Sequence, residues 1–143
     1  MDFRLNLNVE TVARLEALPP ICVEPGLTAS DALRELQARR RSTILICRAG
    51  KLTGIFTERD AIRLMTADAN LDVPVEQVMT RDPVVVSPED SVGDAIAKMS
   101  RGGYRRLPIV DREGTPTGVL SVRQILRYLV EHFPNAIYTL PPT

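Results

Sequence analysis

The sequence predicts an α+β protein built from two pseudo-symmetric β-α-β-β-α repeats that pack together through their sheets. The first observation is that the segment Gly54–Asp60 (GIFTERD) returns 64 positions later as Gly118–Gln124 (GVLSVRQ). The second is that the apolar strand led by Pro20 returns at Pro83, after 63 positions. The third is that short β-branched runs alternate with helical stripes in each copy. Two such copies form a pseudo-symmetric pair rather than a solenoid.

The repeat divides the chain into five predicted segments. They are an N-terminal helical extension, the first copy, a linker, the second copy and a tail, at residues 1–16, 17–66, 67–80, 81–131 and 132–143. The extension is predicted to be helical because apolar side chains recur at helical spacing from Val9 to Leu18, where Pro19 follows. The linker contains polar residues and a helical turn led by Pro74.

The first copy contains five predicted elements. In order they are a strand, a helix, two strands of a hairpin and a second helix, at Ile21–Val23, Thr28–Arg40, Thr43–Cys47, Leu52–Phe56 and Thr57–Thr66. Both helices begin with a hydroxyl residue that an acid follows three positions later, as Thr57 is followed by Asp60. This spacing is typical of a capping box.

The second copy repeats this order. Its predicted elements are Val84–Val86, Ser91–Arg101, Arg106–Val110, Thr117–Leu120 and Ser121–Glu131. Ile44–Cys47 aligns with Pro108–Asp111 at the spacing of 64, whereas Asp31 and Asp94 keep 63. We therefore expect that one residue was gained between the first helix and the second strand.

Composition and the lack of certain motifs argue against several classes of protein. The 143 residues carry 18 basic and 18 acidic side chains, only 4% aromatics and no Trp, which argues against nucleic-acid binding. We find no nucleophile–base pair, no phosphate loop and no metal-ligand cluster, so we expect no enzyme and no metal. Cys22 and Cys47 lie in apolar runs and are expected to be buried free thiols. Without a signal or membrane segment, we expect a soluble, cytoplasmic protein.

Four motifs together resemble a tandem pair of CBS domains, or Bateman module. They are Gly54–Asp60, Gly118–Gln124, Arg106–Asp111 and the Pro83–Pro88 opening of the second copy, within a resemblance that covers residues 17–131. The resemblance implies a regulatory module that senses an adenosine-containing ligand, such as AMP, ADP, ATP or S-adenosylmethionine. It also implies a homodimer, an effector protein that reads the ligand state, and no required cofactor.

The resemblance also implies a ligand site that combines both copies. Its residues would be Thr57, Asp60, Pro83, Val84, Tyr104, Arg105, Arg106, Pro108 and Arg123. Asp60 would accept hydrogen bonds from the ribose hydroxyls, Pro83 and Val84 would sandwich the base, and the arginines would face phosphates. Chemistry supports these roles, since a helix N-terminus suits phosphate, one carboxylate can accept from two vicinal hydroxyls, and guanidinium groups bind phosphate in pairs of hydrogen bonds.

A second, weaker site is implied in the pseudo-equivalent position. Its residues would be Ile21, Cys22, Arg41, Arg59, Ser121 and Gln124. Gln124 stands where the family pattern has the ribose-binding Asp, and an amide carries no charge. Ser42 is also aligned with Arg106 of the other copy, so this site would lack an arginine.

Other interpretations remain open at this point. Thr57 and Asp60 could form only a helix cap, in a dimerisation or interaction scaffold that binds no ligand. Arg105 could equally belong to a solvated face. Nucleic-acid binding through the arginines is a further, weaker alternative.

Overall fold

The computed structural model describes residues 7–132 and divides the chain into two compact units. The first-repeat unit contains Pro20–Pro83 together with Arg112–Thr117. The second-repeat unit contains Val84–Asp111 together with residues 7–19 and 118–132. Each unit therefore contains a piece of chain that lies outside its own repeat. The α+β class and the two repeats are confirmed, whereas the packing of the copies through their sheets stays a prediction.

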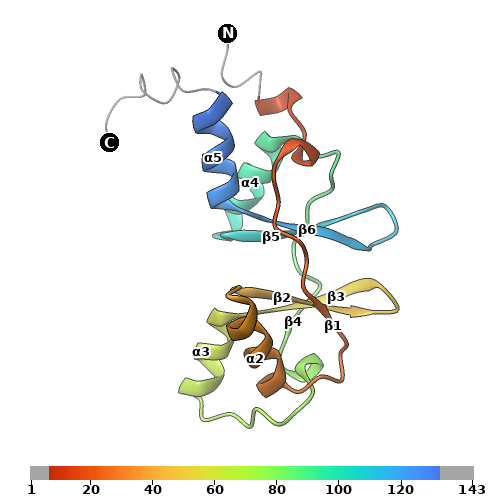
Figure 1. Ribbon diagram of the computed structural model, residues 1–143, viewed down its shortest axis with the longest axis vertical. Helices are drawn as coiled ribbons and strands as arrows, with labels where there is room; N and C mark the ends of the chain where they lie inside the picture. Colours follow the sequence, from red (N-terminus) through yellow and green to blue (C-terminus); the bar gives the residue numbers. More distant parts are fainter. Residues whose placement is uncertain (1–6, 133–143) are drawn as a thin grey trace. The chain divides into compact units, whose positions relative to one another are not determined.

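The first-repeat unit is a four-stranded sheet with its helices on one face (Figure 1). Its elements are β1 (Cys22–Val23), α2 (Ala29–Arg39), β2 (Thr43–Arg48), β3 (Lys51–Thr57), α3 (Glu58–Thr66), the 3-10 turn η2 (Val75–Gln77) and β4 (Thr80–Arg81). The strand order is β1-β2-β3-β4, with β1 parallel to β2 and the other pairs antiparallel. Because side chains alternate across a strand, Ile44 and Ile46 of β2 enter the core that the helices cover.

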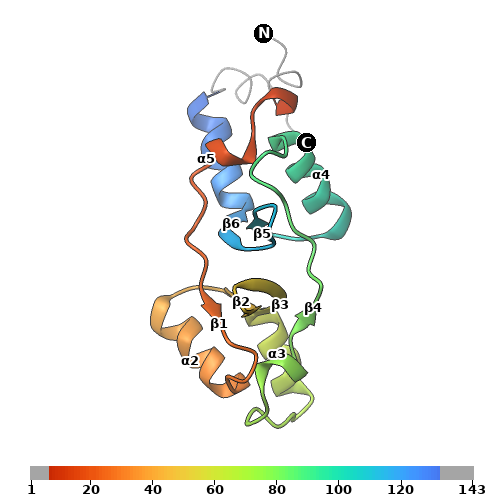
Figure 2. The same ribbon diagram turned by 90° about the vertical axis from the view of Figure 1, so that its right-hand side faces the viewer.

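The second-repeat unit has a two-stranded hairpin and two helices on one of its faces (Figures 1 and 2). Its elements are the 3-10 turn η1 (Val12–Arg14), α4 (Val92–Gly102), β5 (Arg106–Val110), β6 (Pro116–Ser121) and α5 (Val122–His132), of which β6 belongs to this unit from Gly118 onward. Isolated bridges extend the hairpin on both sides, where Val86 pairs with Ile109 and Leu18 pairs with Val119. Leu107, Ile109 and Leu120 supply its core from the strands.

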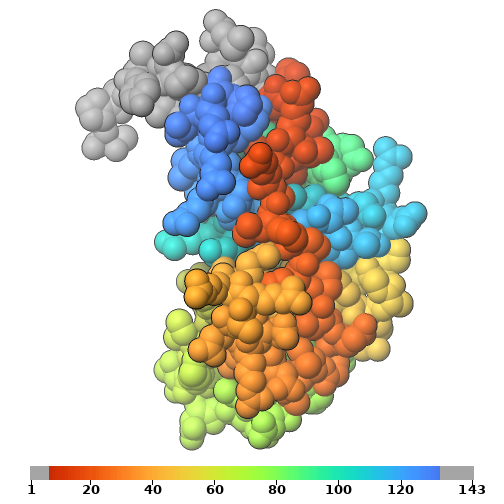
Figure 3. All heavy atoms as spheres, viewed as in Figure 1, coloured from red at the N-terminus to blue at the C-terminus, as the bar shows by residue number. Residues whose placement is uncertain are grey.

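The helix predicted over Val9–Leu18 is wrong. Residues 7–9 are helical, but the chain then forms only η1 and a bridge at Leu18. The reason is that its backbone groups pair with the second repeat: Val12 N–H donates to the Asp90 carbonyl at 2.8 Å, and Ala13 N–H donates to the Pro88 carbonyl at 3.0 Å. Val12 and Leu15 still point into the core, and the segment lies against α5 (Figure 3).

The strand predicted over Val84–Val86 is also reduced. Only Val86 pairs with β5, through its N–H to Pro108 and its carbonyl from Val110. Val84 is exposed, whereas Val86 is fully buried. The β propensity of three valines is therefore realised at one position. In the first repeat the Leu45 N–H donates to the Ile21 carbonyl, but its counterpart Pro108 has no N–H to donate to Val84.

The position of the inserted residue was also predicted wrongly. The core positions Ile44 and Ile46 correspond to Leu107 and Ile109, which keeps the spacing of 63 through the second strand. Glu58 N–H donates to the Ser42 carbonyl at 3.1 Å, as Val122 N–H donates to the Arg105 carbonyl at 3.0 Å. The extra residue therefore lies in the hairpin between the second and third strands of the second repeat.

This register changes which residues are equivalent in the two repeats. Ser42 corresponds to Arg105 rather than to Arg106, and the buried Thr43 corresponds to Arg106. The first repeat thus has no arginine at either position, so it departs from the second repeat by two charges rather than one.

Cys22 is exposed, contrary to the prediction, and Cys47 is buried. Cys22 pairs with Leu45, and both lie on the sheet face opposite Ile44 and Ile46. Strand β1 is an edge strand, so its outward side chains have a neighbouring strand on one side only.

Candidate adenosine-ligand site

The N-terminus of α3 carries Thr57 and Asp60 in a complete capping box. Asp60 N–H donates to the Thr57 hydroxyl oxygen at 3.2 Å, and Thr57 N–H donates to Asp60 Oδ2 at 3.0 Å. The Thr57 hydroxyl also donates to Oδ2, at 3.1 Å. Among residues 7–132, Asp60 Oδ1 accepts no hydrogen bond. The box therefore fixes the carboxylate at the helix start and leaves one of its oxygens free to accept.

Strand β3 delivers this helix start directly. Thr57 is the last residue of β3 and the N-cap of α3, in an extended conformation with φ −122° and ψ 167°. Glu58 N–H is satisfied by the Ser42 carbonyl at the start of β2. The start of the second strand and the start of the second helix are thereby joined, so Arg41, Ser42 and the Thr57–Asp60 turn lie together.

The N-terminus of α5 has the same arrangement with an amide. Ser121 N–H donates to Gln124 Oε1 at 3.0 Å, the Ser121 hydroxyl contacts the same oxygen, and Gln124 N–H donates to Ser121 Oγ at 3.3 Å. An amide has one oxygen, and the box occupies it. Gln124 thus offers its N–H donors at the position where Asp60 offers a carboxylate oxygen.

The charges beside the two helix starts also differ. The link from Val122 to the Arg105 carbonyl brings Arg105 and Arg106 to the start of α5, where Arg123 also lies. At the start of α3, Arg59 is accompanied by the acids Glu58 and Asp60. Arg105 and Arg123 are exposed, and Arg106 is half-buried. The α5 start therefore suits an anion, and the α3 start suits a group that donates hydrogen bonds.

The predicted site residues come from both units. Thr57, Asp60 and Pro83 belong to the first-repeat unit, together with Ile21, Cys22, Arg41 and Arg59. Val84, Tyr104, Arg105, Arg106, Pro108, Ser121, Arg123 and Gln124 belong to the second-repeat unit. Within each unit the structure brings together the second-helix start and the residues that precede the second strand. The assembly of both groups into one site stays a prediction.

The apolar residues of the predicted site differ in exposure. Val84 and Tyr104 are exposed at 39% and 41%, whereas Pro108 is fully buried. The ring of Tyr104 lies over Gly102, since a Cβ at Gly102 would stand 2.0 Å from it. The glycine at position 102 therefore leaves the space that the Tyr104 ring occupies.

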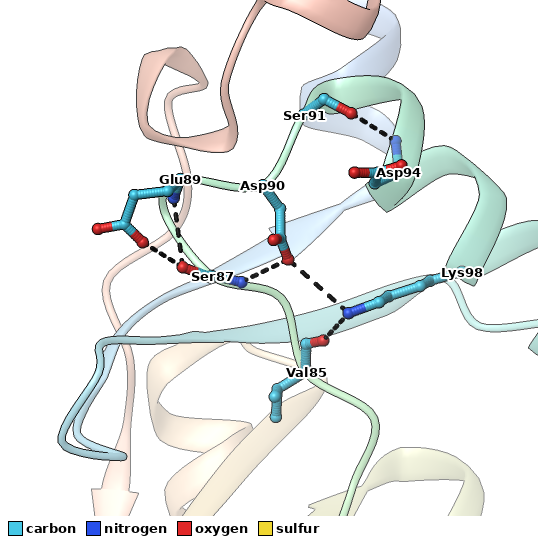
Figure 4. A network of polar contacts seen from close by, with 7 residues as sticks. All are labelled: Val85, Ser87, Glu89, Asp90, Ser91, Asp94 and Lys98. Carbon is cyan, nitrogen blue, oxygen red and sulfur yellow. Dashed lines mark hydrogen bonds and ion pairs between the residues drawn. The ribbon is translucent and has the colours of Figure 1, made fainter.

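Sequence reasoning missed Lys98. Its ammonium donates to the carbonyl of Val85 at 2.8 Å, next to the predicted base-binding Val84 (Figure 4). The residue gives no local signal, because a lysine on a helix surface is ordinary and its target lies 13 residues earlier in the chain.

Two further kinds of site have no support within the part that the structure describes. Over residues 7–132, no group of three or more His, Cys, Asp or Glu side chains is arranged to hold a metal ion. No helix in the same range combines the length and apolar character needed to cross a bilayer.

Known proteins match this chain over most of its length. The CBS domain family model matches residues 12–67 and 75–131. An uncharacterized 17.7 kDa protein of Acidianus ambivalens is 31% identical over 121 residues, which cover 84% of this chain and 73% of that protein. The CBS domain-containing protein CBSCBSPB5 of Arabidopsis thaliana is 34% identical over 81% of this chain, which spans only 22% of that longer protein.

Solved structures with a similar fold also contain CBS domains. The CBS domain pair of protein MJ0100, in complex with 5'-methylthioadenosine and S-adenosyl-L-methionine, superposes with a TM-score of 0.77 at 22% identity, covering 86% of this chain and 98% of that one. At this identity the likeness concerns the fold. The CBS domain protein PAE2072 of Pyrobaculum aerophilum, complexed with AMP, has a TM-score of 0.75 at 25% identity, over 85% of this chain and 98% of that one. The chain belongs to the CBS domain family and is a tandem pair of such domains.

Proposed function

We propose that the chain is a regulatory module that binds an adenosine-containing ligand through Asp60 and has no catalytic activity of its own. The observation that carries the proposal is the fixed carboxylate at the start of α3, whose Oδ1 has no partner among residues 7–132. A ribose presents two vicinal hydroxyl donors, which such an oxygen can accept. The AMP complex of the Pyrobaculum aerophilum relative supports an adenosine ligand for this fold.

The remaining roles follow from the charges of the second-repeat unit. Arg105, Arg106 and Arg123 surround the start of α5, so they are proposed to bind the phosphates of the ligand. Pro83 and Val84 are proposed to enclose the base, with Tyr104 and Pro108 as further apolar contacts. In this arrangement the ligand is shared between the two repeats, and its binding energy favours one arrangement of them.

The second site is proposed to be weak or empty. Gln124 has its oxygen engaged by Ser121, and Ser42 and Thr43 stand where the other repeat has Arg105 and Arg106. Ile21, Cys22, Arg41 and Arg59 would line it. Gln124 has no carboxylate oxygen to hold a ribose, and the first-repeat side of this site has no counterparts of Arg105 and Arg106 for phosphate.

The test is a thermal-shift panel with AMP, ADP, ATP and S-adenosylmethionine. A ligand at 100 times its Kd stabilises the native state by about 2.7 kcal/mol, so one of these ligands is expected to raise the melting temperature. Asp60→Ala and Gln124→Ala form a matched pair, because each removes one capping box. We expect Asp60→Ala to abolish the shift and Gln124→Ala to keep it.

Asp60→Asn separates the cap from the charge. Asparagine retains an oxygen for Thr57, so the helix start is kept while the carboxylate is lost. We expect near-native stability and a loss of the ligand shift. The opposite ranking of Asp60 and Gln124 variants contradicts the site assignment, and an absence of any shift in the unmodified chain favours the scaffold interpretation.

In addition to ligand binding, we propose that the chain forms a homodimer, because apolar side chains are exposed on two of its helices. Val122, Leu126 and Val130 follow one another at a spacing of four along α5, and Ile62 and Met65 are exposed on α3. We propose that a second copy covers these helix faces. The effector protein that reads the ligand state, and a cytoplasmic location, are further parts of this proposal.

A further inference from the structure

The loop between residues 84 and 91 is held by a polar network centred on Lys98 (Figure 4). The Lys98 ammonium donates to the Val85 carbonyl at 2.8 Å and lies 3.7 Å from Asp90 Oδ2. The same Asp90 oxygen accepts a hydrogen bond from Ser87 N–H at 2.9 Å. One side chain of α4 therefore ties down both ends of the loop.

This network decides the conformation of the segment that precedes the bridge. Val86 is bonded to β5 on both of its polar groups, through Pro108 and Val110. The polar groups of Val85 lie on the side of the chain that faces away from β5, where its carbonyl accepts the hydrogen bond of Lys98. Within the described residues the Val85 N–H has no acceptor. The backbone next to Val84 is thus held by the Lys98 side chain at Val85 and by the single bridge at Val86.

The first repeat lacks this device. Glu35 corresponds to Lys98 at the spacing of 63, and it pairs with Arg39 on the helix surface instead. Leu27 corresponds to Asp90, so the second member of the network is missing as well. In the first repeat, Cys22 and Val23 form β1 and are held by the sheet. The two repeats therefore hold equivalent segments by different means.

We propose that Lys98 is a positioning residue for ligand binding, which holds Val84 and Val85 in the conformation that receives the base. The inference depends on the proposed function, in which Val84 contacts the ligand. The Lys98 head group itself is directed at Val85 and Asp90, so it acts through the backbone rather than through the ligand. A charge-assisted hydrogen bond to a carbonyl is strong enough to select one loop conformation.

The test compares three variants of the full chain: Lys98→Met, Lys98→Arg and, as a matched control on the equivalent helix, Glu35→Met. Methionine keeps the length and apolar stem of lysine but cannot donate. We expect Lys98→Met to raise the Kd for AMP, or for the ligand that the thermal-shift panel identifies, by about tenfold. Lys98→Arg should restore binding to within about threefold, and Glu35→Met should leave the Kd unchanged.

Hydrogen exchange of the ligand-free chain gives a readout that does not depend on the ligand. The amides of Val86 and Val110 form the bridge that the network supports, so both should exchange faster in Lys98→Met, while core amides of β2 should not change. Unchanged exchange at these amides contradicts the loop-holding role. Faster exchange with an unchanged Kd, or no rescue by arginine, contradicts the positioning role. If the unmodified chain bound no adenosine ligand, the proposed function and the positioning role would both fail, and faster exchange would then leave Lys98 a structural role only.

Discussion

Asp60 and Gln124 occupy equivalent positions, the third residue of α3 and of α5, and both close a capping box with the hydroxyl residue before the helix. The cap and the site are therefore not alternatives, since the same side chain performs the first with one oxygen and can perform the second with another. At Gln124 the two tasks compete for a single oxygen. One oxygen atom is thus the chemical difference on which the asymmetry of the two proposed sites depends.

The two cysteines should differ in reactivity. Burial, together with a hydrogen bond that the Cys47 thiol donates to Cys22, raises the pKa of the Cys47 thiol from 9.0 to about 12, and Cys47 is only 6% exposed. Because the thiolate is the reactive form, Cys47 should react slowly with Ellman's reagent at pH 8, while the exposed Cys22 reacts fast. We expect one fast thiol and one slow thiol in the native chain.

The Cys22→Ser variant checks this assignment, because it should remove the fast phase and leave the slow one. The same pKa gives a dependence of stability on pH. Since the native state disfavours the Cys47 thiolate, its contribution to stability is complete below about pH 9 and is lost as the pH rises towards about 12. Two thiols that react at one rate in the native protein would contradict the predicted difference.

Gly54 and Gly118 owe their identity to close approach of a neighbouring chain segment. A Cβ at Gly54 would stand 2.2 Å from the Met79 sulfur, and a Cβ at Gly118 would stand 3.2 Å from the Ala17 Cβ. We expect Gly54→Ala to lower the free energy of unfolding by about 1–3 kcal/mol, as overpacking usually does. Chemical denaturation measures this change.

The partner residue supplies the control for that prediction. A Met79→Ala background removes the three atoms nearest to the added methyl group, so Gly54→Ala should cost less there. The difference between the two backgrounds is the coupling energy of a double-mutant cycle. An equal cost of Gly54→Ala in both backgrounds would show that Met79 is not the cause.

At the scale of elements, the sequence predicted what is local and failed where pairing is remote. The helix starts at Thr28, Thr57, Ser91 and Ser121 were predicted correctly, because a cap is a contact between residues three apart. Strand β4 was missed, since its two residues pair only because Gly54 and Ile55 lie beside them. The sequence could not decide whether the second strands of the two repeats are 63 or 64 residues apart. Both strands are apolar throughout, so apolar residues align with apolar residues at either spacing.

The same distinction applies to the candidate site. The Thr57–Asp60 and Ser121–Gln124 pairs, and their difference, could be predicted from the repeat alone. Lys98 could not, because the loop that it holds follows no periodic pattern. The N-terminal segment has helical spacing at Val12 and Leu15, yet its hydrogen bonds go to Asp90 and Pro88. Tertiary partners thus override a local preference there.

The N-terminal segment should stabilise the second-repeat unit although it precedes the first repeat. Val12 is fully buried in the same core as Val92 and Leu120. We expect Val12→Ala to lower the free energy of unfolding by about 2 kcal/mol and to speed hydrogen exchange in α4 and α5 more than in α2. Ala13→Ser, at the exposed neighbouring position, is the control and should change stability by less than about 0.5 kcal/mol. A larger loss in α2 than in α4 would contradict the assignment.

At the scale of the whole molecule, the exposed apolar faces of α3 and α5 bear on the oligomeric state. Leu126 and Val130 are 55% and 52% exposed. If a second copy covers them, Leu126→Glu should turn the dimer into a monomer, because it places a charge in an apolar contact. Light scattering coupled to size-exclusion chromatography measures the mass directly.

The control for this prediction is Arg127→Glu, which changes charge at the next, exposed position of α5. It should leave the mass unchanged. A monomeric unmodified chain, or a Leu126→Glu variant that stays dimeric, would contradict the homodimer proposed through α5.

The contribution of residues 7–19 to the second-repeat unit has a consequence for biosynthesis. Vectorial translation releases Val12 and Leu15 from the ribosome well before α4, β5 and α5 emerge to cover them. The whole first repeat is therefore synthesised while two apolar side chains upstream of it remain without their partners. Until α5 has been synthesised, these exposed apolar side chains favour misfolding and binding by chaperones.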